Sequence, residues 1–424
     1  MRFENVNDIA AWRLCLGCGA CAWACENKAV NLIDVTDDGI RPSVGESCQG
    51  CGRCVEVCPG ADTSHGKWAE GVDPELSSSW GPVFEVWEGH AADPEVRFKG
   101  SSGGAATALA LYCLEKEGLY GAVHAGADKD EPWKNKTQLS KSREELLGKS
   151  GSRYSPASPC DGLGIMEAAP SPSVFIGKPC DVAGLRKAQA ISAELDSRTA
   201  LAISIFCAGT PSTKGTIDLL ARFRKEPSEI ESLRYRGNGW PGNWTAESSA
   251  GTSSIPYKTA WSFLQRYRPL RCQLCPDGTG EFADISCGDP WYREITPGEP
   301  GLSLILARTD KGRRVLKAAA EAGYLKIKKI DSSLLEKSQA NLLAKRRAIW
   351  GRLLGLRLLL APVPTLSGFS LFENWKGLSA YEKLRSVAGT LRRALRREYY
   401  RRSRSFPVRA VLRDISIIRK RGAI

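Results

Sequence analysis

The sequence predicts an α/β core that follows a small cysteine-rich module and precedes a basic, mainly α-helical C-terminal tail. Short apolar runs alternate with helical patterns through the middle of the 424 residues, which is typical of a sheet covered by helices. Two runs of four closely spaced cysteines fall near the N-terminus. The positive charge of the chain is concentrated at the other end. The ordinary hydrophobic share of 42% indicates a globular protein with a sizeable core.

The cysteine runs are CLGCGACAWAC (15–25) and CQGCGRCVEVCPG (48–60), each with gaps of two, two and three residues. Zinc sites use two pairs separated by a longer loop, and disulfides are the other alternative. The C-x2-C-x2-C-x3-C pattern is instead typical of bacterial ferredoxins that hold 4Fe–4S clusters, where the fourth cysteine of a run binds the other cluster. We therefore expect two clusters in a ferredoxin-like module, one on Cys15, Cys18, Cys21 and Cys58 and the second on Cys48, Cys51, Cys54 and Cys25.

The N-terminus gives a prediction about the compartment. MRFENVNDIA contains no apolar stretch that could serve as a signal peptide. No run approaches the roughly 18 apolar residues that a membrane-spanning helix needs. Thiolate clusters also favour a reducing compartment, where disulfides are rare. We expect a cytoplasmic protein.

The net charge of +13 is unevenly distributed. Residues 331–424 contain 21 Lys or Arg and 6 Asp or Glu, whereas residues 1–330 contain 39 and 41. We therefore divide the chain into a ferredoxin-type module (1–62), a polar linker (63–95), an α/β core (96–330) and a basic C-terminal extension (331–424). The strands expected in the core are 173–177, 200–206 and 302–308, and the helices include 181–190 and 311–323.

A small-residue loop, GSSGGAATAL (100–109), opens one predicted helix of the core. Such a loop lets a ligand approach backbone N–H groups at the positive end of the helix. It suits a pyrophosphate or the edge of a flavin ring, with an ordinary tight turn as the alternative. The loop matches neither the Walker pattern nor G-x-G-x-x-G.

The core has cysteines of its own at the ends of predicted strands. Cys180 follows the strand 173–177 and Cys207 follows 200–206, while Cys272 and Cys275 form a C-x2-C pair. Ligands of α/β folds bind at strand ends, so four cysteines there suit a third cluster. For any single one, a buried structural cysteine is the alternative.

Seven motifs occur in an order that resembles the coenzyme F420 hydrogenase/dehydrogenase beta-subunit family, over roughly residues 12–320. They are FKGSSGGAATAL, GSRYSPAS, FIGKPCDVAGLRK, IFCAGTPS, RYRGNGWPGNW, CQLCPDGTGEFADISCGD and LILARTDKG. The resemblance implies an FAD-binding α/β flavoprotein core with its own 4Fe–4S cluster. It implies Cys180, Cys207, Cys272 and Cys275 as the ligands of that cluster, with Cys287 as a competing ligand.

The same resemblance implies a flavin site. The residues implied to contact FAD are Ser101, Ser102, Gly103, Gly104, Thr107, Arg153, Tyr154, Lys178, Gly239 and Trp240. Arg153 would supply a cation and Tyr154 a stacking ring. Lys178 would stabilise the negative charge of reduced flavin, and Trp240 would stack on a ring unless its role is purely structural. Lys178 and Trp240 are the predicted catalytic residues.

The function expected is an iron–sulfur flavoprotein oxidoreductase. Electrons would pass between ferredoxin, or another low-potential carrier, and an organic hydride acceptor or donor such as coenzyme F420, in either direction, because flavin converts single electrons into pairs. One alternative is a flavin-dependent reductase of a tetrapyrrole or a sugar-pathway intermediate. Another is an electron-transfer subunit of a larger hydrogenase or dehydrogenase. A partner subunit or a homo-oligomer is compatible with either.

The basic tail lies outside the resemblance. Residues 391–422 place Leu391, Leu395 and Tyr399 at helical spacing among many arginines, a pattern that binds anionic membranes or acidic partners. The neighbouring segment AIWGRLLGLRLLLAPVP (348–364) adds Trp350 and a leucine-rich face. We expect peripheral association with the inner face of a membrane, with docking of an acidic protein or a solvated helix as alternatives. Nucleic-acid binding ranks last, since no recognition motif accompanies the charge.

Overall fold

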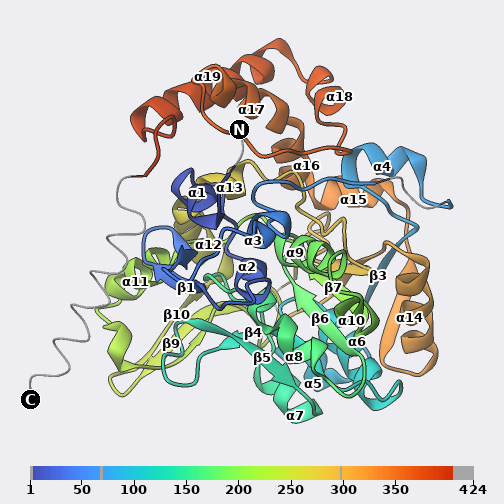
Figure 1. Cartoon of the computed structure of the whole chain (residues 1–424). Coiled ribbons are helices and arrows are strands. Elements are labelled where there is room, and N and C mark those ends of the chain that lie inside the picture. Colours follow the sequence, from blue (N-terminus) through green and yellow to red (C-terminus); the bar gives the residue numbers. More distant parts are fainter. Residues whose placement is uncertain (1–2, 67–69, 297, 404–424) are drawn as a thin grey trace, which may run out of the picture.

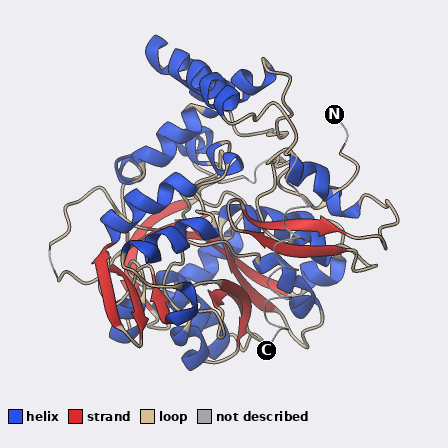
Figure 2. Ribbon diagram, turned by 90° about the vertical axis from the view of Figure 1, so that its left-hand side faces the viewer, coloured by secondary structure: helices blue, strands red, loops and turns tan. Residues whose placement is uncertain are grey.

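A computed structural model describes residues 3–66, 70–296 and 298–403. Its centre is an eight-stranded sheet in the order β13-β3-β12-β11-β7-β6-β4-β5 (Figures 1 and 2). The strands are β3 (Glu85–Ala91), β4 (Ala122–Ala127), β5 (Asn135–Ser140), β6 (Ser173–Gly177), β7 (Thr199–Ile205), β11 (Ile285–Gly288), β12 (Ser303–Ala307) and β13 (Leu325–Lys329). The four strands β4, β6, β7 and β11 run parallel, and the strands outside them are antiparallel to their neighbours. The predicted α/β core is therefore confirmed.

The sheet is buried on both faces because neighbouring residues of its central strands point to opposite sides. Val174 packs into a cluster with Leu109 of one covering helix, and Phe175 packs into a second cluster with Leu185 of another. The helices of the first face are α5 (Pro94–Lys99), α6 (Ala105–Glu115), α7 (Arg143–Gly148) and α14 (Asp310–Glu321). Those of the second face are α8 (Leu163–Glu167), α9 (Pro179–Gln189) and α10 (Ala193–Ser197), with the 3-10 turn η1 (Pro159–Gly162).

The segment predicted as a linker contains structured elements. Helix α4 (Pro74–Trp80) and strand β3 both lie inside residues 63–95, and β3 pairs with β12 and β13 in the middle of one half of the sheet. The core thus begins earlier than predicted. Sequence pattern misses β3 because its interior carries Glu88, Gly89 and His90, which lack the apolar alternation of a typical strand.

A second, smaller sheet stands beside the main one. Strands β8 (Ile230–Arg234), β9 (Asn243–Ser248) and β10 (Gly251–Pro256) form an antiparallel sheet in the order β10-β9-β8. The elements associated with it are α11 (Thr213–Arg222), η2 (Pro227–Glu229), α12 (Tyr257–Leu264), η3 (Gln265–Tyr267) and α13 (Leu270–Gln273). Trp244 and Leu220 are fully buried in the cluster that joins α11 and α12 to this sheet.

The N-terminal module is compact and packs against the second face of the core. Its elements are α1 (Val6–Ala11), α2 (Ala20–Trp23), α3 (Arg53–Glu56) and the hairpin β1 (Val30–Val35) and β2 (Gly39–Val44). Ala20 and Cys18 share a buried cluster with Val182 and Leu185 of α9. The N-terminal module and the α/β core therefore share a hydrophobic core.

The helices of the C-terminal extension cover the N-terminal module and part of the core (Figure 1). Its helices are α15 (Ser333–Ser338), α16 (Ala340–Arg347), α17 (Ile349–Arg357), α18 (Leu371–Lys376) and α19 (Ala380–Arg396). The segment after α17 runs along the module, where the backbone N–H of Thr63 donates to the carbonyl oxygen of Thr365 at 3.0 Å. The N–H of Ser403 likewise donates to the carbonyl of Ala11 at 2.9 Å.

Part of the leucine surface that was predicted to face a membrane is buried. Ile349, Leu353 and Leu356 are buried against the N-terminal module, and Trp350 packs on Trp375 with ring centroids 4.4 Å apart. Of the predicted amphipathic stretch 391–422, residues 404–422 lie outside the described residues, and Tyr399 is buried. Leu358, Leu360 and Leu395 are exposed, so association of the extension with a membrane stays a prediction.

Candidate functional site

The first group of cysteines closes around a small cavity in the N-terminal module. Cys15, Cys18, Cys21 and Cys58 all line it, although Cys58 belongs to the second cysteine run. Glycines with positive φ make the turns around it, such as Gly17 at φ +72°. A Cβ atom at Gly17 would lie only 2.8 Å from the carbonyl oxygen of Ile40, so a larger residue would not fit.

A hydrogen bond with Cys160 lowers the pKa of Cys18, whereas the largest effect on the other three thiols of this group is burial. Burial raises the pKa of Cys58 to about 12, with Cys15 and Cys18 adding to the rise, and it also raises the pKa of Cys15 and Cys21. Thiolates at such a place need a cation to be stable, and a bound iron–sulfur core supplies one. The crossed arrangement predicted for this cluster fits the positions of the side chains.

The second group lies nearer the surface. Burial raises the pKa of Cys54, and the neighbouring thiols of Cys48, Cys51 and Cys25 raise it further. Cys25 thus accompanies the second run, as the ferredoxin pattern predicts. Cys48 and Cys51 are exposed, whereas Cys15, Cys18 and Cys21 are buried. An external electron carrier can therefore approach the second group directly.

A third group forms in the core. The pKa of Cys207 is raised to about 11, first by burial and then by Cys272, with Cys275 also contributing. Cys180 has a raised pKa too, with burial as the main cause and Cys207 and Cys275 among the others. Cys287 differs, because burial alone raises its pKa to about 12. The structure therefore brings together the four cysteines implied by the family resemblance and sets Cys287 apart from them.

Among the described residues, no three His, Cys, Asp or Glu side chains converge closely enough to hold a single metal ion.

The start of α9 lies between the N-terminal and the core cysteines. Lys178 caps this helix, and its Nζ contacts Asp181 Oδ2 at 2.6 Å and the carbonyl oxygen of Ala157 at 3.2 Å. Burial lowers the pKa of Lys178, but the carboxylate of Asp181 outweighs that effect and raises it. Asp181 also acts electrostatically on Cys18 and on Cys180. A buried ion pair thus connects two of the three cysteine groups.

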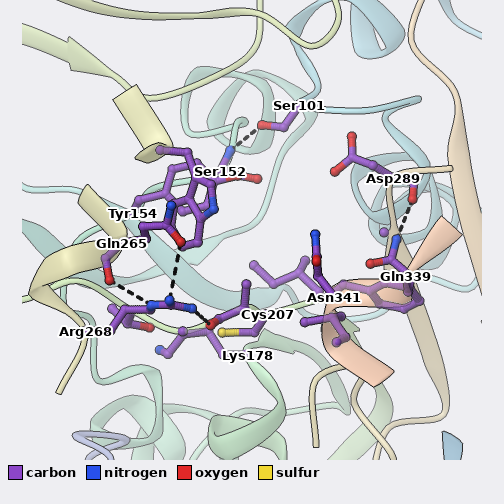
Figure 3. Close-up of a pocket in the computed structure, with 18 of the residues that line it drawn as sticks. Ser101, Ser152, Tyr154, Lys178, Cys207, Gln265, Arg268, Asp289, Gln339 and Asn341 are labelled. Carbon is purple, nitrogen blue, oxygen red and sulfur yellow. Dashed lines mark hydrogen bonds between the residues drawn. The ribbon is translucent and has the colours of Figure 1, made fainter. Parts of the chain in front are cut away.

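A cavity of about 1290 Å³ opens at the carboxyl ends of the parallel strands. Lys178 after β6, Cys207 after β7 and Asp289 after β11 all line it (Figure 3). This is where α/β sheets bind ligands. The volume exceeds the roughly 300–1,000 Å³ of a typical ligand pocket, so the cavity has room for a flavin and a second ligand.

The predicted glycine loop borders the cavity. Ser101, Ser102, Gly104 and Thr107 line it. Helix α6 begins after Gly104, which has φ +74° and makes no side-chain cap, so backbone N–H groups of the first turn are left for a ligand. Ser101 itself accepts from the backbone N–H of Ser152 at 2.5 Å (Figure 3).

Gly103 stands behind this loop and has a packing role. It does not belong to the cavity lining that the structure describes. A Cβ at Gly103 would lie 2.7 Å from both the carbonyl oxygen of Gly89 and the nitrogen of Ser303. Its absent side chain lets the loop approach β3 and β12, so a larger residue here would disturb the sheet.

Arg153 and Tyr154 also line the cavity, in different ways. The guanidinium of Arg153 donates to backbone carbonyls, at 2.8 Å for Leu233 and 3.2 Å for Lys134, and fixes the loop. The ring of Tyr154 stacks on Tyr257 with centroids 5.8 Å apart and tilts against Trp261 at 5.1 Å. The stacking ring predicted at Tyr154 is therefore one of three aromatic rings that lie together on the cavity lining.

Gly239 and Trp240 lie behind the lining, on the turn that carries the cis bond between Trp240 and Pro241. The indole N–H of Trp240 donates to Asp289 Oδ1 at 2.9 Å, and its ring stacks on Trp291 at 6.0 Å. The structure thus gives Trp240 a supporting position, which was the structural alternative for this residue.

Sequence reasoning missed two parts of the site. One is the buried pair of Arg236 and Asp289, with nitrogen–oxygen distances of 2.7 and 2.8 Å; Arg236 was visible within RYRGNGWPGNW, but its partner is 53 residues away. The other is the wall supplied by the extension. Its lining residues include Lys345, Arg352, Arg385 and Arg393, and no local pattern connects them with the core.

Comparisons with known proteins agree with this architecture. The family model described as "Coenzyme F420 hydrogenase/dehydrogenase, beta subunit N-term" matches residues 86–163, and the corresponding C-terminus model matches residues 173–333. A model described as a 4Fe-4S dicluster domain matches residues 10–64. The first two lie close together in the chain and cover the main sheet and the part of the cavity lining that the core supplies. The extension beyond residue 333, which supplies the rest of the lining, lies outside all three models.

Curated relatives carry related names. The coenzyme F420 hydrogenase subunit beta of Methanothermobacter thermautotrophicus is 27% identical over 61% of this chain and 91% of its own length. The coenzyme F420-dependent sulfite reductase of Methanocaldococcus jannaschii is 24% identical over 74% of this chain and 47% of its own length. These relatives are oxidoreductases or components of them. A solved F420-reducing [NiFe] hydrogenase complex from Methanosarcina barkeri contains a chain with the same fold (TM-score 0.52, 22% identity, covering 68% of this chain and 97% of that one).

In the part of the chain that the structure describes, no helix is long and apolar enough to cross a membrane.

Proposed function

The chain belongs to the coenzyme F420 hydrogenase/dehydrogenase beta-subunit family, and we propose that it passes electrons between 4Fe–4S clusters and coenzyme F420 or a related organic substrate, with FAD bound in the cavity. One observation carries the proposal. Cys207 belongs to the core cysteine group and also lines the cavity at the strand ends. A one-electron centre held there adjoins the space where an organic substrate binds.

FAD is the cofactor whose chemistry this juxtaposition needs, because a flavin exchanges both single electrons and hydride equivalents. The residues fit it. The uncapped first turn of α6 suits a pyrophosphate, and Tyr154, Tyr257 and Trp261 offer an apolar wall for rings. Lys178 holds a buried positive charge at the same cavity through its contact with Asp181.

The cysteine groups form a series from surface to cavity. Cys48 and Cys51 are exposed, the group of Cys15 is buried, and Cys207 borders the cavity. We assign the exposed end to an external one-electron partner, either ferredoxin or another subunit. The names of the relatives, which describe beta subunits, favour a partner subunit as the second candidate.

Cofactor content tests the proposal. Full-length protein reconstituted anaerobically with iron, sulfide and FAD should retain about twelve irons and an equimolar amount of non-covalent FAD. Ala106 lines the cavity in the first turn of α6, so Ala106→Trp should abolish retention of FAD and leave the iron content unchanged. The matched control is Lys116→Trp, at the exposed end of the same helix, which should retain both.

Two results would contradict the assignment. Wild-type protein that retains no flavin would reject the FAD site. An iron content near eight per chain would reject the cluster on the core cysteines while leaving the two N-terminal clusters.

A subunit can be told from a self-contained enzyme by adding reduced ferredoxin and F420 to the isolated protein. Turnover by the chain alone identifies an enzyme. Turnover only after addition of a partner hydrogenase or dehydrogenase identifies a subunit.

A further inference from the structure

The cavity has a strongly basic lining. Among the described residues, twelve Lys or Arg and three Asp or Glu line it. Two of the three acids are engaged by cations of the core, Asp181 by Lys178 and Asp289 by Arg236. The third, Glu382, caps helix α19 through the N–H of Ser379 at 3.1 Å. The lining therefore has a large excess of positive charge.

Part of that excess belongs to the core cysteines. Lys345 acts on Cys207 and Cys275, and Arg268 is close enough to Cys272 and Cys207 to be influenced by both. These two side chains offset the negative charge of a cluster.

Three further arginines come from the extension and face one another. Burial, together with the neighbouring charges of Arg393, Arg268 and Arg385, lowers the pKa of Arg352 to about 10. Gln273 holds two of them, since its backbone carbonyl accepts from Arg352 at 2.6 Å and its side-chain oxygen accepts from Arg393. The ion pairs of the described extension involve other arginines, namely Arg346, Arg347, Arg401 and Arg402. Arg352 and Arg393 form no ion pair within the described extension, whereas Arg385 interacts electrostatically with Glu382, one helical turn before it. Arg352 is repelled by both of the other two arginines.

We propose that Arg352, Arg385 and Arg393 form a polyanion subsite at the mouth of the cavity, which binds a phosphate or polycarboxylate arm of the organic substrate. The proposal rests on the proposed function, because it assigns the second ligand of the same cavity. Guanidinium groups bind phosphate and carboxylate through charge-assisted hydrogen bonds. A multiply charged arm relieves the repulsion among the three arginines, while the reacting ring lies deeper, toward Lys178 and Cys207. The extension is then a specificity element that the family models do not include.

The experiment compares two double variants of α19. Arg385→Gln with Arg393→Gln removes two lining arginines, and the control, Arg392→Gln with Arg396→Gln, removes two exposed arginines that do not line the cavity. Both variants change the net charge equally on the same helix. Binding of inorganic tripolyphosphate and of tricarballylate to the full-length, cluster-loaded protein is measured by calorimetry.

The lining variant should weaken binding of the preferred anion about 100-fold, since two charge-assisted hydrogen bonds are lost. The control should change it less than about threefold, the size expected of screened surface charges. Preference for tripolyphosphate identifies a phosphate arm, and equal or better binding of tricarballylate identifies a carboxylate arm; either supports the subsite. In turnover with F420, the lining variant should raise KM and leave kcat unchanged.

Equal weakening of anion binding by both variants would overturn the proposal, because the effect would then come from the overall positive charge of the helix and not from the lining arginines. So would full-length protein that binds neither anion. Flavin retention and reduction of F420 are recorded on the same samples. If these persist while the anion results fail, only the subsite is wrong; if anions bind as expected but flavin is not retained, the subsite stands and the proposed function fails.

Discussion

The single residues with the clearest roles are the cysteines, because both the fold and the sequence spacing indicate which of them lie together. Cys58 lies with Cys15, Cys18 and Cys21 around one cavity, while Cys25 acts on Cys54. The third cysteine of each run lies in a short helix, Cys21 in α2 and Cys54 in α3, and the fourth cysteine follows that helix. We therefore propose two cluster sites, each of which takes three cysteines from one run and the fourth from the other.

This crossing can be tested by substitution. We expect Cys58→Ala and Cys15→Ala to eliminate the same cluster, and Cys25→Ala and Cys48→Ala to eliminate the other, because each pair shares one set of irons. Electron paramagnetic resonance of the reduced protein distinguishes the signal that remains. Cys113→Ala, a buried cysteine of α6, is the control and should retain both signals. If Cys58→Ala matched Cys48→Ala instead, the crossed assignment would be wrong.

Lys178 and Asp181 form the other pair whose residues can be separated experimentally. Lys178→Met leaves the buried carboxylate of Asp181 without its cation, so the free energy of unfolding should fall by about 3–5 kcal/mol. Adding Asp181→Asn should restore much of it, because the uncompensated charge is then gone. Urea denaturation under anaerobic conditions measures both. Lys258→Met, at an exposed position on the same cavity, should have little effect on the free energy of unfolding. An equal loss in Lys258→Met would show that the contact between Lys178 and Asp181 is not the cause.

At the scale of elements, the three parts of the chain are joined by a buried ionic network. Glu281, from the loop after the C-x2-C pair, contacts Arg346 of α16 and His65 of the segment after the N-terminal module, the latter at 2.9 Å. Arg308 and Asp277 also act on this network. Burial raises the pKa of Glu281, but Arg346 and His65 outweigh it and leave the pKa below the ordinary value.

The network predicts a pH-dependent contribution to stability. Because the folded-state pKa of Glu281 is below its unfolded value of about 4.3, its contribution is fully present above that value and is lost as the pH falls through the folded pKa. Glu281→Gln should therefore lower the thermal midpoint at neutral pH, with a loss that shrinks as the solution is made more acidic than pH 4. Glu373→Gln, a substitution in the first turn of α18, serves as the control. A difference between Glu281→Gln and wild type that did not vary with pH would rule out a charge effect.

Elements with strong local patterns were predictable from sequence, and those defined by distant partners were not. The strand expected over 173–177 is β6, and the helix expected over 181–190 is α9, because apolar runs and a Pro-led helix start are local signals. Strand β3 was not predicted because its central residues are polar or glycine. Pairing with β12 on one side and β13 on the other stabilises it despite this weak pattern. In the site, the cysteines and the α6 loop were found by spacing, whereas the contact of Arg236 with Asp289 and the arginines of α19 depend on long-range packing.

At the scale of the whole molecule, the extension contacts both the N-terminal module and the cavity of the core. It covers the N-terminal module through Ile349, Leu353 and Leu356 and supplies one wall of the cavity. We propose that the exposed Cys48 and Cys51 face a one-electron carrier and that the cavity receives an organic substrate. The central claim is that electrons move between them inside a single chain.

That claim is tested most directly in a single turnover. Full-length protein loaded with clusters and FAD is reduced anaerobically, freed of reductant and mixed with oxidised F420, while cluster paramagnetic signals and F420 absorbance are followed together. We expect the cluster signals to disappear as F420 is reduced, with about two electrons lost for each F420 converted, because F420 accepts a hydride and the clusters give up single electrons. Clusters that stay reduced while F420 stays oxidised, in protein shown to retain its flavin, would contradict the account.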